Sequence, residues 1–116
     1  MKKTQEEIAR ADGRYDAGAF KFVYDGLGYT VKHMDEPGHV TGQVLSDGLR
    51  RMALERWGRL ALLVLDVWGV HSTRDFGEIV YELIEHEWMS ALPTDSIDDF
   101  NDVYSFHAAF RDGFEF

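Results

Sequence analysis

The chain has 116 residues, of which 45% are hydrophobic and 14% aromatic, and its formal net charge at pH 7 is -9. This length suits one domain with a hydrophobic core. The absence of cysteine excludes disulfides, zinc–thiolate sites and cysteine catalysis, and the negative charge opposes non-specific binding to nucleic acid or to an anionic membrane.

The N-terminal stretch carries no targeting signal. Its sequence, MKKTQEEIARADGRYD, is charged throughout and lacks the apolar run of a signal peptide. The most apolar stretch, residues 60–70, is shorter than the roughly 20 residues that span a bilayer, and Asp66 interrupts it. We therefore expect a cytoplasmic protein without a membrane segment.

Two helices are predicted at the start of the chain. Thr4 followed by Glu7 is the pattern of a capping box, and a short helix is expected from there to Gly13. Apolar residues at helical spacing predict a second helix over 15–34. Two glycines weaken this pattern, and a short strand over 29–34 is the alternative.

A turn at residues 35–39 separates this helix from a third, which Thr41 caps and whose apolar stripe continues to Trp57. Glycine directly follows Trp57 and again Trp68, which fits the left-handed conformation that commonly ends a helix. The helix between them, residues 59–68, is apolar on nearly every side. We therefore expect it to be the buried centre of the domain.

The second half contains the strongest helical pattern. Ser72 or Thr73 caps a helix over 73–89, and its apolar residues recur at helical spacing. These residues are Phe76, Ile79, Val80, Leu83, Ile84 and Trp88. A last helix is expected around 100–107, with extended structure over 103–116 as the alternative.

These patterns predict an all-α fold. We expect a single compact domain of about five helices spanning residues 1–116, with 1–13 and 111–116 as candidate mobile ends. The two helices over 59–89 have the outline of a helix-turn-helix, the motif that many transcription factors insert into DNA.

The charge on the second helix of this pair argues against DNA binding. If its apolar stripe faces inward, five acidic residues and one basic residue remain outside. They are Asp75, Glu78, Glu82, Glu85 and Glu87 against Arg74. A recognition helix presents Arg, Lys, Asn or Gln to bases and cations to phosphates, so we predict that this helix pair is a packing motif without a DNA-binding role.

The leading prediction is a non-enzymatic protein–protein interaction or regulatory module with an acidic binding face. Its partner would be a protein with a basic surface. The candidate residues are Glu78, Glu82 and Glu85 on the helix, and Phe114 and Phe116 in an acidic, aromatic C-terminal tail. The alternative for the tail is that its aromatic side chains fold back on the core. The oligomeric state is left open.

A first alternative function is nucleic-acid or phosphate binding through a basic cluster. The cluster consists of Arg50, Arg51, Arg56 and Arg59. Asp47 and Glu55 lie among these arginines, and a solvated helix face of mixed charge is common.

A second alternative is a small metal-dependent enzyme. Glu82 and His86 lie four residues apart and could share a metal ion. The HExxH, GxSxG, GxxxxGK[ST] and GxGxxG motifs do not occur. We therefore assign no catalytic residue, metal or cofactor.

Four segments of the chain are YDAGAFKFVYDGLGYT, HVTGQVLSDGLRRMALERWG, WGVHSTRDFGEIVYELIEHEWM and DSIDDFNDVYSFHAAF. These segments resemble a family of short bacterial proteins of unknown function associated with planctomycetes and verrucomicrobia. The resemblance covers most of residues 14–110. The resemblance implies a bacterial, cytoplasmic, stand-alone domain, and it transfers no functional role because the family has no assigned activity. The chain departs from the family's commoner residues at His71 and in the EHEW segment, which argues against a metal role for His71 or His86.

Overall fold

The computed structural model describes residues 2–112, and over this range the fold is all-α, as predicted. The chain is 66% helical, and no strand occurs among the described residues. In chain order the elements are α1 (Gln5–Asp12), α2 (Ala17–Lys32), α3 (Gly42–Trp57), the 3-10 turn η1 (Gly58–Leu60), α4 (Ala61–Val67), α5 (Thr73–Glu85), the 3-10 turn η2 (Ile97–Phe100) and the π-helical turn η3 (Ala108–Asp112). None of the helices in residues 2–112 combines the length and apolarity needed to cross a lipid bilayer.

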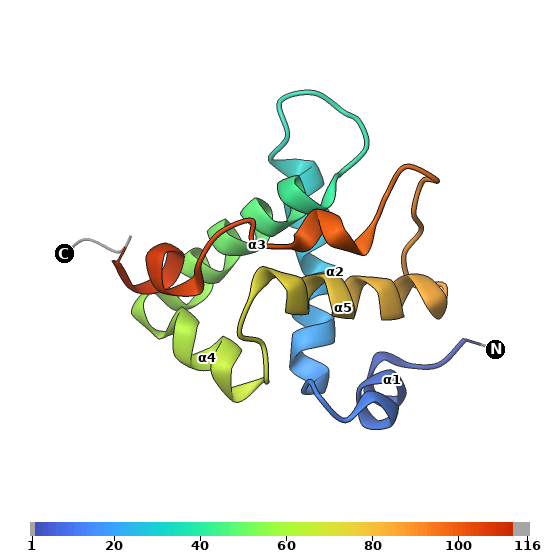
Figure 1. Cartoon of the computed structure of the whole chain (residues 1–116), viewed down its shortest axis with the longest axis horizontal. Coiled ribbons are helices and arrows are strands. Elements are labelled where there is room, and N and C mark those ends of the chain that lie inside the picture. Colours follow the sequence, from blue (N-terminus) through green and yellow to red (C-terminus); the bar gives the residue numbers. More distant parts are fainter. Residues whose placement is uncertain (1, 113–116) are drawn as a thin grey trace.

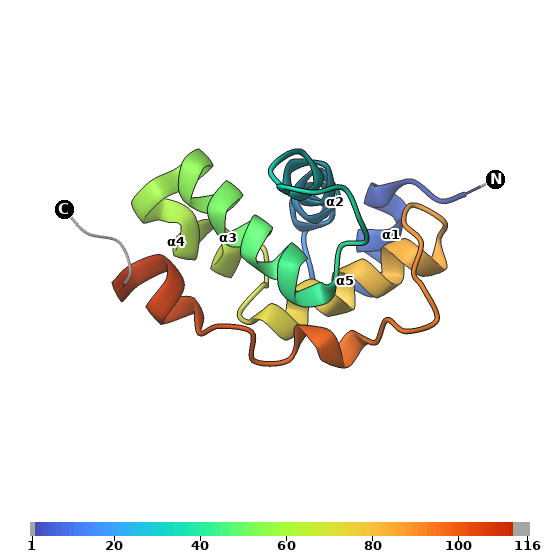
Figure 2. The ribbon, with the colours of Figure 1, turned by 90° about the horizontal axis from the view of Figure 1, so that it is seen from above.

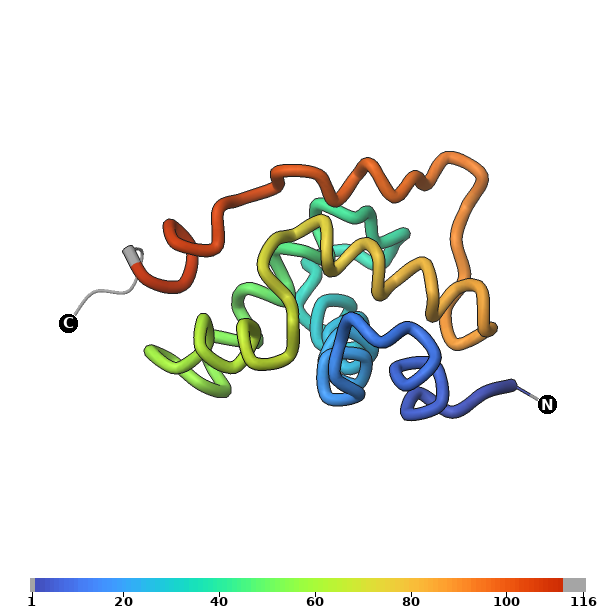
Figure 3. Tube along the Cα trace, turned by 60° about the horizontal axis from the view of Figure 1, so that its bottom comes forward, coloured from blue at the N-terminus to red at the C-terminus, as the bar shows by residue number. Residues whose placement is uncertain are grey.

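Helix α2 runs through the middle of the domain, and α5 crosses it (Figure 1). Helices α1 and α4 lie at opposite ends of the molecule, near the N- and C-terminal ends respectively (Figure 1). The segment that follows α5 returns along one side of the molecule from the α1 end to the α4 end (Figures 2 and 3). The radius of gyration is 13.6 Å, close to the roughly 13 Å expected for one compact domain of this size.

Helix α1 is capped and packed on the core. The predicted capping box is present, because the Thr4 hydroxyl accepts from the Glu7 amide and the Glu7 carboxylate accepts from the Thr4 amide, both at 3.1 Å. Ile8 and Ala9 of α1 are buried. Within the segment 1–13, which we predicted as a candidate mobile end, residues 5–12 therefore form a helix that is anchored to the domain.

Glycines allow α2 and α3 to approach closely. A Cβ atom added at Gly48 would lie 1.9 Å from the hydroxyl oxygen of Thr30, and one added at Gly26 would lie 2.2 Å from a methyl carbon of Leu49. The Thr30 side chain is buried and donates a hydrogen bond to the Gly26 carbonyl at 2.7 Å. Gly26, one of the two glycines that weaken the helical pattern of α2, is thus required for the packing of α2 against α3. Because α2 continues to Lys32, the alternative of a strand over 29–34 is wrong.

We expect Gly48→Ala to lower the free energy of unfolding by up to about 2 kcal/mol. The added methyl group overpacks the contact with Thr30, at a cost of about 1–3 kcal/mol, and the better helix propensity of alanine offsets about 1 kcal/mol of it. Gly28→Ala is the matched control, because Gly28 is helical and exposed and its added Cβ meets no atom within 4 Å. This control should gain up to about 1 kcal/mol. Urea unfolding of both variants measures the two effects, and stabilisation by Gly48→Ala would contradict the close packing.

The prediction of a buried central helix over 59–68 is wrong. Its residues form η1 and α4 at the edge of the domain, where Leu60, Leu63 and Val67 remain 58%, 58% and 72% exposed. The centre is instead α2, in which Phe20 and Phe22 are 0% and 1% exposed. A helix that is apolar on every side is expected to be covered by other elements on every side. Here the domain covers only one side of it.

Helix α5 ends at Glu85, four residues before the predicted end, which also shortens the helix-turn-helix-like pair. Glu87 adopts a positive φ of 67°, and the amides of Trp88 and Met89 both donate to the Leu83 carbonyl, at 2.8 and 3.2 Å. This pattern terminates a helix. The Trp88 indole then donates to the Lys3 carbonyl at 2.8 Å and so holds the chain at the N-terminal end.

The last predicted helix, around 100–107, does not form. The chain has a 3-10 turn, η2, that ends at Phe100, and the described helical structure resumes at residues 106–112. Buried aromatic contacts fix this segment instead. Phe106 packs against Phe76 and Phe110, with ring centroids 5.5 and 5.1 Å apart, and Tyr104 donates a hydrogen bond to the Ser46 carbonyl at 2.6 Å.

Candidate functional site

The apolar stripe of α5 faces the core, as predicted. Phe76, Ile79 and Leu83 are fully buried, and Val80 is 6% exposed. The carboxylates of α5 therefore lie on the side away from the core, which confirms the premise of the argument against a DNA-reading helix.

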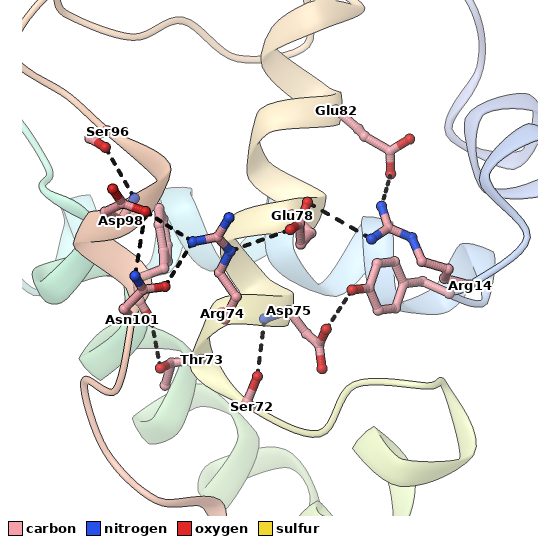
Figure 4. Close-up of polar contacts among 12 residues, drawn as sticks. Arg14, Ser72, Thr73, Arg74, Asp75, Glu78, Glu82, Ser96, Asp98 and Asn101 are labelled. Carbon is pink, nitrogen blue, oxygen red and sulfur yellow. Dashed lines mark hydrogen bonds and ion pairs between the residues drawn. The ribbon is translucent and has the colours of Figure 1, made fainter.

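Two arginines neutralise part of this acidic surface (Figure 4). Arg14, in the link between α1 and α2, lies 3.8 Å from Glu78 and 4.0 Å from Glu82. Arg74 lies 3.3 Å from Glu78 and 3.0 Å from Asp98 in η2. Glu78 is thus placed between two guanidinium groups, so its charge is engaged within the chain and contributes little to an open acidic face.

Further polar contacts join α5 to the rest of the domain. Tyr15 donates a hydrogen bond to Asp75 at 2.5 Å, and the same carboxylate accepts from the His71 amide at 2.8 Å. Burial and this bond to Asp75 raise the pKa of Tyr15. The Thr73 hydroxyl donates to the Phe100 carbonyl at 2.6 Å. The surface of α5 therefore serves mainly to hold the N- and C-terminal segments in place.

Glu82 forms a carboxyl pair with Asp12 at the end of α1. Burial and the hydrogen bond with Asp12 raise the pKa of Glu82 to about 8. Burial also disfavours the charged form of Asp12, but hydrogen bonds from Arg14 and Glu82 outweigh it and lower the pKa of Asp12 to about 2. The raised pKa of Glu82 and the lowered pKa of Asp12 favour one proton held by the pair, and the Asp12 carboxylate lies 2.8 Å from Arg14. The Glu82 side chain is only 23% exposed, so it contributes little to the predicted acidic face.

The remaining residues of the predicted docking face have different outcomes. Glu85 is exposed. Phe114 and Phe116 lie outside the described residues. Of the four phenylalanines near the C-terminus, Phe106 and Phe110 pack on the core, which was the alternative prediction for the tail.

The four arginines of the predicted basic cluster do not share one face. They are Arg50, Arg51, Arg56 and Arg59. Arg50 pairs with Asp47 at 3.0 Å, and Arg56 lies 3.6 Å from Asp25 of α2. Arg51 lines a hollow between α2 and α3, whereas Arg59 lines a different one beside α4. A phosphate backbone could not contact all four at once along one surface.

The predicted metal pair, Glu82 and His86, gains no third ligand in the described part of the chain. Among residues 2–112, no group of three or more His, Asp or Glu side chains is close enough together to hold a metal ion. Glu82 is instead paired with Asp12 and Arg14.

A cleft of about 690 Å³ lies between α4 and the C-terminal segment. Its floor consists of Val70, Phe106 and Phe110, which are 1%, 5% and 1% exposed. Leu62 and Leu63 of α4 form one wall. This volume and this apolar lining are typical of protein pockets that bind ligands or side chains of a partner.

The rim of the cleft is mainly basic, although the chain as a whole is strongly acidic. It carries four basic residues: Arg59, Arg111, His71 and His107. Among the described residues of the lining, Asp66 is the acidic one, and its carboxylate lies 3.1 Å from Nδ1 of His71. All five of these side chains are exposed. The cleft therefore combines an apolar floor with an edge that attracts negative charge.

The outer face of α4 extends this apolar surface. Leu60, Leu63 and Val67 lie at helical spacing and are the largely exposed apolar residues of η1 and α4. Leu63 also lines the cleft, so the cleft and the helix face form one surface. The sequence contained a signal for this site, because a helix that is apolar all round needs contacts on every side. It did not reveal that one side is left open.

Comparisons of the chain with protein-family models, with curated proteins and with solved structures find no match. The resemblance to short bacterial proteins therefore stays a prediction.

Proposed function

We propose that this protein is a non-enzymatic interaction module that binds a segment of another protein. Its binding site is the docking surface, which we define as the cleft together with Leu60 of η1 and Leu63 and Val67 on the outer face of α4. This proposal keeps the predicted class of function but moves the site away from the acidic face of α5. In line with the family resemblance, we place the module in the bacterial cytoplasm.

The observation that carries the proposal is the open apolar face of α4. Large apolar side chains that stay exposed on adjacent turns of one helix mark interaction sites when they form a continuous patch with a cleft. Burying one such side chain in an interface contributes about 1.5–3 kcal/mol. A partner that covers this face and fills the cleft would therefore gain enough free energy for specific binding.

The chemistry of the cleft favours binding over covalent catalysis. Asp66 and His71 form a carboxylate–imidazole pair at its rim, which is the arrangement that activates a nucleophile in many hydrolases. No serine, threonine, tyrosine or cysteine occurs among the described residues that line the cleft. The described lining of the cleft thus offers the pair no hydroxyl or thiol to activate.

Site-specific photocrosslinking in the cell tests the proposal. A photoreactive amino acid at position 63 should give a covalent adduct with one other protein, and the same amino acid at position 92 should not. Leu92 is the matched control because it is 48% exposed and does not line the cleft. The captured protein should also bind the purified chain, about tenfold or more weakly when Leu63 is changed to Asp.

Equal capture from positions 63 and 92, or none from positions 60, 63 and 67, would contradict the proposed site.

A further inference from the structure

We infer that the docking surface selects a protein segment that is acidic and carries an aromatic side chain. This inference rests on the proposed function and reverses the basic partner that the sequence predicts. It follows from two properties of the cleft, the charge of its rim and the shape and apolarity of its floor.

The rim supplies the charge complementarity. Arg59 and Arg111 carry permanent positive charges, and the described lining holds one carboxylate, that of Asp66, which lies 3.1 Å from His71. A basic segment would be attracted to much of this acidic protein, but it would meet like charge at the cleft. An acidic segment is repelled by most of the surface and finds complementary charge at this edge, which makes its binding specific to the cleft.

The floor supplies the apolar anchor site. Val70, Phe106 and Phe110 present a buried apolar base, and the edge-to-face contact of the two phenylalanines fixes its shape, with an angle of 86° between their rings. Aromatic side chains are the commonest anchors in such pockets, because they bury a large area for few rotatable bonds.

A nucleic acid fits this site less well than a peptide does. It carries negative charge along its whole length and would pass from the basic rim onto acidic surface on either side. A short acidic segment needs favourable contacts only at the rim. An anionic membrane would present the same difficulty over a still larger area.

Selection from a library of short random peptides displayed on phage tests the inference without assuming a sequence. The full chain is the bait. We expect the enriched peptides to carry more Asp and Glu than Lys and Arg and to contain an aromatic residue. Their affinity should fall about tenfold or more with Arg111→Glu. It should change less than about twofold with the matched control Arg10→Glu, because Arg10 is exposed on α1 at the other end of the molecule.

Several results would overturn the inference. Enriched peptides that are basic, but whose binding is lost with Leu63→Asp, would refute the acidic partner and leave the docking surface in place. Enrichment only on a Phe114→Ala/Phe116→Ala bait would assign the cleft to residues 113–116 of the chain itself. Self-association that Leu63→Asp abolishes would assign it to a second copy. If no peptide is enriched on either bait, or if binding is indifferent to Leu63→Asp, the proposed function fails as well.

Discussion

Phe76→Ala is expected to lower the free energy of unfolding by about 3–5 kcal/mol, the usual cost of removing a buried aromatic side chain. Phe76 is 0% exposed, and its ring contacts Phe22 of α2 and Phe106 of the C-terminal segment, with centroids 6.4 and 5.5 Å apart. The substitution therefore leaves a cavity where three segments meet. Since a domain of this size is stabilised by only about 5–15 kcal/mol, much of the stability should be lost. Urea unfolding followed by circular dichroism measures the change.

Leu63→Ala is the control for this prediction. The sequence pattern places residue 63 in a buried helix, whereas its side chain is 58% exposed. We expect the substitution to cost less than about 1 kcal/mol, in the range of surface positions. A loss for Leu63→Ala as large as that for Phe76→Ala would mean that α4 is buried after all and would remove the basis of the docking surface.

Glu82→Gln is expected to abolish a loss of stability that the unmodified protein undergoes as the pH rises from about 4.5 to about 8. The pKa of Glu82 is raised from 4.5 to about 8 in the folded protein. Between these values the unfolded chain releases the proton while the folded chain keeps it, so the unfolded state gains as the pH rises. Because one pKa unit corresponds to about 1.4 kcal/mol, we expect the loss to exceed about 1 kcal/mol. The neutral amide that this substitution introduces can still donate a hydrogen bond to Asp12 but cannot ionise.

Asp12 makes the opposite contribution at acidic pH. Its pKa is lowered from 3.8 to about 2 in the folded protein, so its stabilising effect is complete above pH 3.8 and is lost as the pH falls through about 2. The carboxyl pair therefore stabilises the fold most between about pH 4 and pH 4.5. Thermal unfolding between about pH 2 and pH 8 measures both losses of stability. Glu85→Gln, at an exposed position of the same helix, is the matched control. An unchanged loss of stability above pH 4.5 in Glu82→Gln would show that another group is responsible.

Local sequence signals predicted most of the helices correctly. The capping box at Thr4 and the cap at Thr41 are both present, because a hydroxyl that bonds to the next turn acts within four residues. The stripe from Phe76 to Leu83 is buried as its spacing indicates. The end of α5 was missed, since it depends on the positive φ of Glu87, a position at which the sequence offers no glycine.

The candidate site was less predictable, because charge and apolarity in a sequence do not say which neighbours a side chain meets. The acidic residues of α5 were correctly placed outside the core, but Arg14, more than sixty residues away in the chain, pairs with Glu78. The basic cluster was predicted from residues that are close in sequence, yet the fold places Arg51 and Arg59 in different hollows. The basic rim of the cleft combines Arg59 with Arg111, which are far apart in the sequence.

By itself the sequence determined the all-α class, the starts of α1, α3 and α5, and the inward face of α5, since each of these follows from periodicity and hydrogen bonding within a few residues. Only the tertiary structure decided that α2 and not α4 occupies the centre, that Glu82 meets Asp12, and that a cleft opens beside α4. These features depend on which helix faces come into contact. A domain with few helices cannot cover every apolar helix face, so the packing decides which face is left open. The apolar side of α4 left over by this packing is the surface on which the proposed function rests.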